Sequence, residues 1–180
     1  MKQILIPIAH GSEEIEAVTL VNVLRRAGFE VTLASVSDLQ ISGARKINLV
    51  ADQLLADCQN KSYDGIFLPG GMPGATHLQK SDVLISMLQK QAQSGKYYGA
   101  ICASPALVLA HHGLLAGKKA TCYPGFEENL PDKSLIHQKV VVDGNCVTSQ
   151  SPATAQEFAL QITALLGGQD RAQKIRQDLC

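Results

Sequence analysis

The sequence predicts an α/β fold in which helices sandwich a doubly wound, mostly parallel sheet that carries one antiparallel hairpin. Strand-like and helix-like segments alternate along the chain, which is the pattern of parallel strands joined by crossover helices. Hydrophobic residues make up 46% of the chain but aromatic residues only 4%, so aliphatic side chains fill the interior, as in strands buried on both faces. The length of 180 residues suits one domain, and we expect a single domain over residues 1–180.

The chain is expected to begin with a strand and then a helix. Gln3–Ala9 is an apolar run, and acidic residues follow it at once with no cleavage site, so it indicates a strand rather than a signal peptide. Glu14–Ala27 is predicted to be a helix, ended by Gly28 in the usual C-terminal position. Apolar residues at a spacing of three predict that its buried face holds Ile15, Val18, Val21 and Leu24.

The later segments continue the alternation and include one hairpin. Asp143-Gly144 is the strongest hairpin signal in the chain, and it joins the expected strands Lys139–Asp143 and Asn145–Ser149. Further strands or extended segments are expected at Phe29–Val36, Ile47–Val50, Tyr63–Leu68, Tyr97–Ile101 and Lys119–Tyr123, and further helices at Val83–Ala92, Pro105–His112, Thr154–Leu166 and Asp170–Asp178.

Charge and cysteine content exclude several classes of function. Sixteen basic residues balance sixteen acidic ones, so no field of one sign attracts nucleic acid or an anionic membrane. No stretch reaches the ~20 apolar residues of a membrane span, and we expect a cytoplasmic protein. The cysteines are odd in number and form no C-x-x-C pair, which argues against a disulfide framework or a structural zinc site. They are expected to be reduced thiols, at Cys58, Cys102, Cys122, Cys146 and Cys180.

Cys102 lies where a strand is predicted to turn directly into a helix. Pro105 suits the first helical position and Ser104 the N-cap, so the thiol would sit at a helix N-terminus, where its pKa is lowered. Small flanking residues, Ala100 and Ser104, resemble those of the nucleophile elbow of α/β hydrolases. A small buried cysteine that closes a strand is the competing interpretation. Cys122 would end the following extended segment and border the same site.

Two other strand ends carry chemistry, because ligands bind at the carboxyl ends of parallel strands. Glu13 and Glu14 are explained by the preference of helix N-termini for acidic residues, whereas Glu16 lies close to the buried face. A protonated Glu16 there would hydrogen-bond a thiolate or move a proton. Pro69-Gly70-Gly71 is either a simple tight turn or one half of an oxyanion hole, with the N–H of Ala103 as the other half.

Three motifs follow one another in order: Gly11-Ser12-Glu13-Glu14-Ile15-Glu16, Leu68-Pro69-Gly70-Gly71 and Ala100-Ile101-Cys102-Ala103-Ser104-Pro105. In order and spacing they resemble the ThiJ/PfpI superfamily, and most closely its YajL-like branch, which also holds the human Parkinsonism-associated deglycase. The resemblance covers nearly the whole chain. It implies a flavodoxin-like fold and a homodimer that uses no metal and no organic cofactor.

The resemblance also implies roles for individual residues. It makes Cys102 the reactive cysteine, Glu16 its partner, and the amides of Gly71 and Ala103 the oxyanion hole. It places two arginines near the site, where they would hold an anion: Arg26 and Arg45. The human branch carries a histidine where this chain has Tyr123, so the cysteine is expected to work with a glutamate rather than a histidine.

The implied function is that of a cysteine-dependent protein deglycase or glyoxalase III-like enzyme in oxidative or carbonyl stress defence. Its partners would be a small dicarbonyl substrate (methylglyoxal or glyoxal) or a glycated protein, and a second copy of the chain. A redox-responsive chaperone or stress sensor without turnover is the main alternative. An amidase or peptidase usually needs a base beside the thiol, and a thiamine-pathway role finds no phosphate-binding motif.

Overall fold

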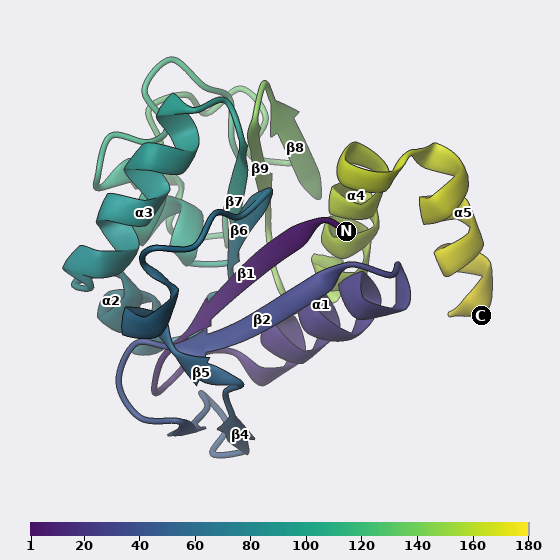
Figure 1. The fold of residues 1–180 in the computed structure, drawn as a ribbon. Coiled ribbons are helices and arrows are strands. Elements are labelled where there is room, and N and C mark those ends of the chain that lie inside the picture. The colour runs from purple at the N-terminus through teal and green to yellow at the C-terminus, as the bar shows by residue number, and fades with distance from the viewer. Residues whose placement is uncertain (180) are drawn as a thin grey trace.

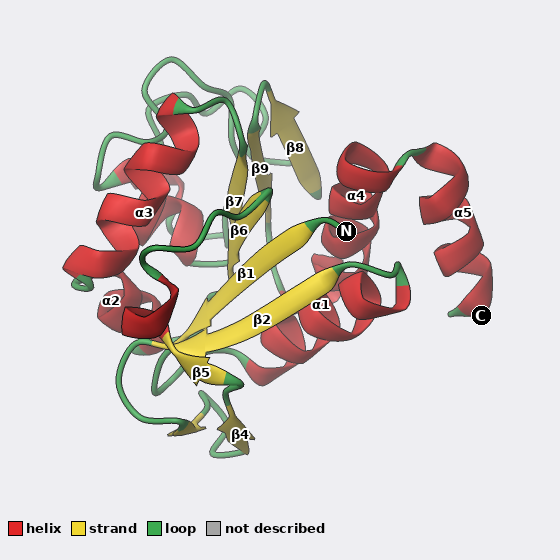
Figure 2. Cartoon of the chain, in the orientation of Figure 1, coloured by secondary structure: helices red, strands yellow, loops and turns green. Residues whose placement is uncertain are grey.

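The computed structural model describes residues 1–179, and its secondary structure follows the alternating order (Figures 1 and 2). The strands are β1 (Gln3–Ile8), β2 (Glu30–Ser35), β3 (Gln40–Ser42), β4 (Asn48–Val50), β5 (Gln53–Leu54), β6 (Gly65–Leu68), β7 (Tyr97–Ile101), β8 (Val140–Asp143) and β9 (Cys146–Ser149). The helices are α1 (Glu14–Arg26), α2 (Gly74–Gln79), α3 (Asp82–Gln93), α4 (Ala155–Gly167) and α5 (Gln169–Asp178). Shorter helical segments are η1 (Leu55–Cys58), η2 (Pro105–Ala110), η3 (Glu127–Asn129) and η4 (Pro152–Thr154).

The main sheet has seven strands in the order β5-β2-β1-β6-β7-β9-β8. Every neighbouring pair is parallel except β8 with β9, so the predicted doubly wound sheet with one antiparallel hairpin is confirmed. A second antiparallel pair, β3 with β4, lies outside this sheet and was not expected as a pair. Because β1, β6 and β7 are adjacent and parallel, their carboxyl ends meet at one edge of the sheet.

Helices cover both faces of the sheet, and the strands contribute alternate side chains to each side. Figure 1 shows α1, α4 and α5 on one side and α2 and α3 on the other. Ile4 and Ile6 of β1 pack in one core with Leu20 of α1 and Phe158 of α4, whereas Leu5 faces the other core, which contains Leu88 of α3. The strands are therefore buried on both sides, as their aliphatic composition requires.

The buried face of α1 was predicted only in part: Leu24 is fully buried as expected, but Ile15 and Val18 are not. Ile15 and Val18 are 57% and 49% exposed, while Ala17 and Leu20 are fully buried. Both sets of residues recur at helical spacing, so periodicity alone does not decide which of them faces the sheet. Glu16 therefore lies on the inner face of the helix beside Ala17, whereas Ile15 and Val18 form an apolar stripe that is exposed to solvent.

Two further elements differ from the expectations. Lys119–Tyr123, expected to be extended, forms no strand: Thr121 gives its N–H to the side chain of Thr148, and Tyr123 gives its own to the carbonyl of Cys102. The short helix α2 was not expected; it starts where Gly71 accepts a hydrogen bond from the N–H of Ala75. Within residues 1–179, no helix combines the length and the apolarity that crossing a bilayer requires.

Candidate functional site

Cys102 occupies a strained turn at the carboxyl end of β7. Its φ of 67° lies in the left-handed region, which non-glycine residues rarely adopt. Backbone hydrogen bonds hold it on both sides: its N–H donates to the carbonyl of Ser149 (3.0 Å), and its carbonyl accepts from the N–H of Tyr123 (2.7 Å). The helical segment η2 begins three residues later, so the structure contains the sharp strand-to-helix turn that the sequence predicts.

The glycine turn after β6 packs directly against Cys102. A Cβ atom on Gly70 would lie 2.6 Å from the Cβ of Cys102, so only glycine fits there. Gly71 has a φ of 88°, and a Cβ there would lie 2.3 Å from the backbone nitrogen of Glu13. The carbonyl of Gly70 accepts a hydrogen bond from the N–H of Glu13 (3.0 Å), which joins this turn to the start of α1. The ends of β1, β6 and β7 therefore converge on one thiol.

Glu16 reaches into this junction from the first turn of α1. The residue is fully buried, and its Oε2 accepts a hydrogen bond from the N–H of Gly70 (2.6 Å). Its Oε1 has no nitrogen or oxygen partner, and the thiol of Cys102 is the neighbouring group that interacts with the carboxyl. Burial raises the pKa of Glu16 from 4.5 to about 7, against the opposing effects of the Gly70 N–H and the Cys102 thiol.

The pKa of the Cys102 thiol is raised rather than lowered, which corrects the prediction from its place at a helix N-terminus. Burial is the largest cause and the negative charge on Glu16 the next, and together they bring the pKa to about 12. The N–H groups of Gly71 and Ala103 act in the opposite direction. A proton on Glu16 removes the repulsion, so the two groups titrate as a pair that carries one negative charge near neutral pH.

Ser104 has a role that the sequence did not reveal. It stands at the predicted N-cap position of η2 but makes no capping hydrogen bond. Its buried hydroxyl instead donates to the carbonyl of Pro69 (2.6 Å) and so ties the Cys102 turn to the glycine turn. The signal was available only in part, because a serine after a strand is equally typical of a cap.

Neither of the two arginines is among the groups that act on the Cys102 thiol. Arg26 bonds Asn22 on the outer side of α1 (Nε to Oδ1, 2.8 Å) and lines a groove of about 500 Å³ with Val18 and Leu49. Arg45 lies exposed in the β3–β4 turn, where its side chain donates a hydrogen bond to the carbonyl of Ala44 (3.3 Å).

Glu14 explains why the β3–β4 turn is fixed. Its Oε1 accepts hydrogen bonds from the N–H groups of Arg45 (2.7 Å) and Ile47 (3.2 Å), although it lies in the first turn of α1. Glu14 is buried, so it does more than balance the helix dipole, which was the expectation from sequence.

The other thiols are less accessible or chemically separate. Cys58 and Cys146 are buried, and Cys180 lies outside the described residues. Cys122 borders the site, because the next residue, Tyr123, donates its N–H to the carbonyl of Cys102. Among residues 1–179, no group of three or more histidine, cysteine or acidic side chains could hold a metal ion. The groups that act on the thiol are Glu16 and two amides, and none is a histidine.

Known proteins resemble this chain in both sequence and fold. The sequence model of the DJ-1/PfpI family matches residues 2–165. Protein DJ-1 homolog B of Arabidopsis thaliana is 51% identical over 94% of this chain, but the match spans only 39% of that protein, about two fifths of its length. The glutathione-independent glyoxalase DJR-1.2 of Caenorhabditis elegans is 35% identical over 98% of this chain and 94% of its own. The structure of oxidized Toxoplasma gondii DJ-1 superposes with a TM-score of 0.95 at 43% identity, over 99% of this chain and 98% of that one.

Proposed function

Because this chain belongs to the DJ-1/PfpI family, we propose that it is a cysteine-dependent enzyme of carbonyl stress defence. Its substrates would be dicarbonyl aldehydes such as methylglyoxal and glyoxal, or their early adducts on proteins. One observation carries the proposal: the Cys102 thiol, the Glu16 carboxyl and the N–H groups of Gly71 and Ala103 form one buried cluster. The relative named as a glyoxalase supports the same chemistry.

The first step draws on the less populated form of the singly ionised pair, in which the proton has moved from the Cys102 thiol to Glu16 and leaves a thiolate. The sulfur attacks the aldehyde carbon, a C–S bond forms, and the carbonyl electron pair moves to oxygen. The amides of Gly71 and Ala103 would stabilise that oxyanion, since both already face the sulfur. Glu16 then gives its proton to the oxygen, which leaves a hemithioacetal and a Glu16 carboxylate.

The second step is a proton transfer within the bound molecule. The Glu16 carboxylate removes the C–H proton of the former aldehyde carbon and returns it to the adjacent carbonyl carbon, while the hydroxyl proton of the hemithioacetal passes to the oxygen of that carbonyl. The aldehyde carbon is thereby oxidised to a thioester while its neighbour is reduced to an alcohol, so no external oxidant is needed. Water cleaves the thioester, regenerates the thiol and releases a hydroxy acid, which for methylglyoxal is lactate.

Steady-state kinetics with methylglyoxal test this proposal. Cys102→Ser removes the nucleophile and Glu16→Gln removes the proton carrier, so both variants should lose most of the turnover. Cys58→Ala and Glu30→Gln are matched controls, because the first changes a distant buried thiol and the second an exposed carboxylate. Equal lactate production by Cys102→Ser and the wild type would overturn the proposal.

An adduct assay separates free aldehydes from glycated proteins as substrates. Albumin freshly treated with methylglyoxal is passed through a desalting column and then incubated with enzyme. If early adducts bind the site directly, lactate forms faster than free methylglyoxal leaves the albumin. Formation limited by that release rate would assign the free aldehyde as the substrate.

A redox-responsive chaperone or stress sensor is the second candidate. The specific observation is again Cys102, since a thiol whose thiolate would be stabilised by two N–H donors and a protonated Glu16 is suited to oxidation. One peroxide molecule would convert it to a sulfenic acid with release of water, and a second would give the sulfinic acid. Mass spectrometry after mild peroxide should show oxidation at Cys102 before buried Cys58 and Cys146; equal oxidation of all three would count against a sensor.

We further propose that the protein is cytoplasmic and forms a homodimer through the outer face of α1. Ile15 and Val18 are exposed on this face. Glu14 holds the β3–β4 turn next to the start of the helix, and two apolar residues of that segment, Ile47 and Val50, are 56% and 67% exposed. A second copy would bury this apolar surface. Arg26 lines the same groove and would lie at the dimer interface.

A further inference from the structure

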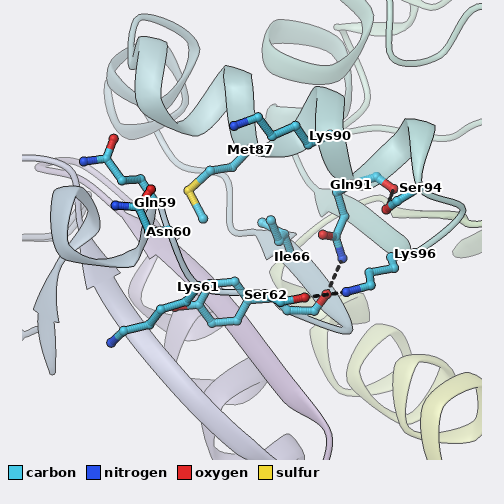
Figure 3. Close-up of a pocket in the computed structure, with 11 residues that line it drawn as sticks. Gln59, Asn60, Lys61, Ser62, Ile66, Met87, Lys90, Gln91, Ser94 and Lys96 are labelled. Atoms are coloured by element: carbon cyan, nitrogen blue, oxygen red, sulfur yellow. Dashed lines mark hydrogen bonds between the residues drawn. The ribbon is translucent and has the colours of Figure 1, made fainter.

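A second cavity lies at the edge of the sheet opposite Cys102. It has a volume of about 440 Å³, and residues 59–63, which lead into β6, form one wall (Figure 3). Helix α3 forms another wall, and Lys96, which directly precedes β7, a third. Because Cys102 follows β7 and Lys96 precedes it, the length of that strand separates the cavity from the thiol.

The cavity has an apolar floor and a cationic rim. Ile66 and Met87 are buried at its base, and Figure 3 shows Lys61, Lys90 and Lys96 around it on three sides. No aspartate or glutamate lines the cavity. Its other lining residues are Gln59, Asn60, Ser62, Tyr63, Gln91 and Ser94, whose polar groups are uncharged.

The ammonium groups on this rim have only neutral hydrogen-bond partners within residues 1–179. Lys96 donates to the hydroxyl of Ser62 (2.6 Å), and Lys61 donates to the side-chain oxygen of Gln53 (3.0 Å). The neighbouring carboxylate is Asp64, whose pKa Lys96 helps to lower. Asp64 bonds the N–H of Gln3 (2.9 Å) and Lys2 (3.1 Å), so it offsets part of the Lys96 charge without forming a hydrogen bond to Lys61, Lys90 or Lys96.

We propose that this cavity binds a phosphorylated small metabolite of about the size of a sugar phosphate. Lysine ammonium groups bind phosphate as point charges, and no arginine lines the cavity. A phosphate monoester carries a charge of about −1.5 to −2 near pH 7, so neighbouring ammonium groups favour it over a single carboxylate. The phosphate would lie between the ammonium groups of Lys90 and Lys96. The sugar would lie over Ile66 and Met87 and bond the side-chain amides of Gln59 and Asn60. The volume falls in the range of small-molecule sites.

Heteronuclear NMR with glucose 6-phosphate as the probe tests the site on the full chain. Saturable shifts are expected at the amides of residues 59–62 and 94–97. The double variant Lys90→Gln, Lys96→Gln should weaken binding at least about tenfold, through loss of charge-assisted hydrogen bonds. Lys174→Gln, an exposed lysine on α5 outside the cavity, is the matched control and should bind as the wild type does.

The comparison ligands decide what is recognised. Glucose should not bind, and citrate should bind more weakly than glucose 6-phosphate; citrate binding as tightly would overturn the preference for phosphate. Equal affinity of inorganic phosphate and glucose 6-phosphate would overturn the role of the apolar floor. Absence of saturable shifts, or no effect of the double variant, would overturn the site itself. Cys102→Ser should bind unchanged, so the outcome is independent of the proposed catalysis.

Discussion

The hydroxyl of Ser104 donates a 2.6 Å hydrogen bond to the carbonyl of Pro69. The two residues are 35 positions apart in sequence and belong to the ends of neighbouring strands, β7 and β6. Pro69 directly precedes Gly70, whose N–H binds Glu16, and Ser104 follows the Cys102 turn by two residues. This bond therefore sets the distance between the proposed nucleophile and the turn that holds its partner.

Ser104→Ala should lower both stability and turnover. The variant leaves a buried carbonyl without its partner, which costs about 1–3 kcal/mol of the free energy of unfolding. Urea unfolding and methylglyoxal kinetics measure the two effects. Ser37→Ala, which changes an exposed serine, is the control. Turnover equal to that of the wild type in Ser104→Ala would show that the bond does not position the site.

Glu16→Gln should change how stability depends on pH. Below about pH 4.5 the carboxyl is protonated in both the folded and the unfolded state; as pH rises towards 7, only the unfolded state loses the proton. The unfolded state then binds fewer protons, so the wild type loses stability relative to Glu16→Gln, by about 3 kcal/mol once the pH exceeds 7. Urea unfolding of both proteins across this range measures the gap, and a gap that stays constant would contradict a raised pKa.

Alkylation of Cys102 should report the coupled pair. If Glu16 and Cys102 share one proton, the rate of reaction with iodoacetamide should rise through an inflection near pH 7, where the pair first loses a proton. Glu16→Gln removes that shared proton and should abolish the inflection, whereas Glu30→Gln should keep it. A rate that increases steadily with pH in the wild type, with no inflection, would mean that the thiol titrates alone.

Val18→Asp should dissociate the proposed homodimer. The charge would fall in the middle of the apolar surface that a second copy covers, and burying an unpaired carboxylate is unfavourable by several kcal/mol. Light scattering after size-exclusion chromatography measures the mass. Val142→Asp changes a valine that is 40% exposed on β8, outside that surface, and should leave the mass unchanged. A wild type that is monomeric at micromolar concentration would contradict the dimer.

Gly70→Ala should damage the site without any change of charge. The added methyl group would overlap the Cβ of Cys102 at 2.6 Å and crowd the Ala103 nitrogen at 3.0 Å, so one of the two turns must move. Overpacking of this kind costs typically about 1–3 kcal/mol. Urea unfolding and the alkylation rate of Cys102 give the two readouts. A fully active, equally stable variant would show that the two turns are less tightly packed than the structure indicates.

The fold was predictable because its signals are local. Strand-like runs such as Tyr97–Ile101, the turn at Asp143-Gly144 and the helix end at Gly28 each depend on a few consecutive residues. The order of the three strand ends also directed attention to Glu16, Gly71 and Cys102 before the structure placed them together. The inner face of α1 was not predictable, because Ile15 and Ala17 both belong to apolar stripes and only packing against the sheet selects one.

The sequence by itself determined the alternating α/β architecture and the residue types at each strand end. Tertiary structure alone decided that Ser104 bonds Pro69 rather than capping a helix, that Glu14 fixes the β3–β4 turn, and that Arg26 lies away from the thiol. It also reversed the expected pKa of Cys102. The physical reason is shared: burial and the approach of groups distant in sequence set hydrogen bonds and charge, whereas sequence patterns report only what neighbours along the chain can do.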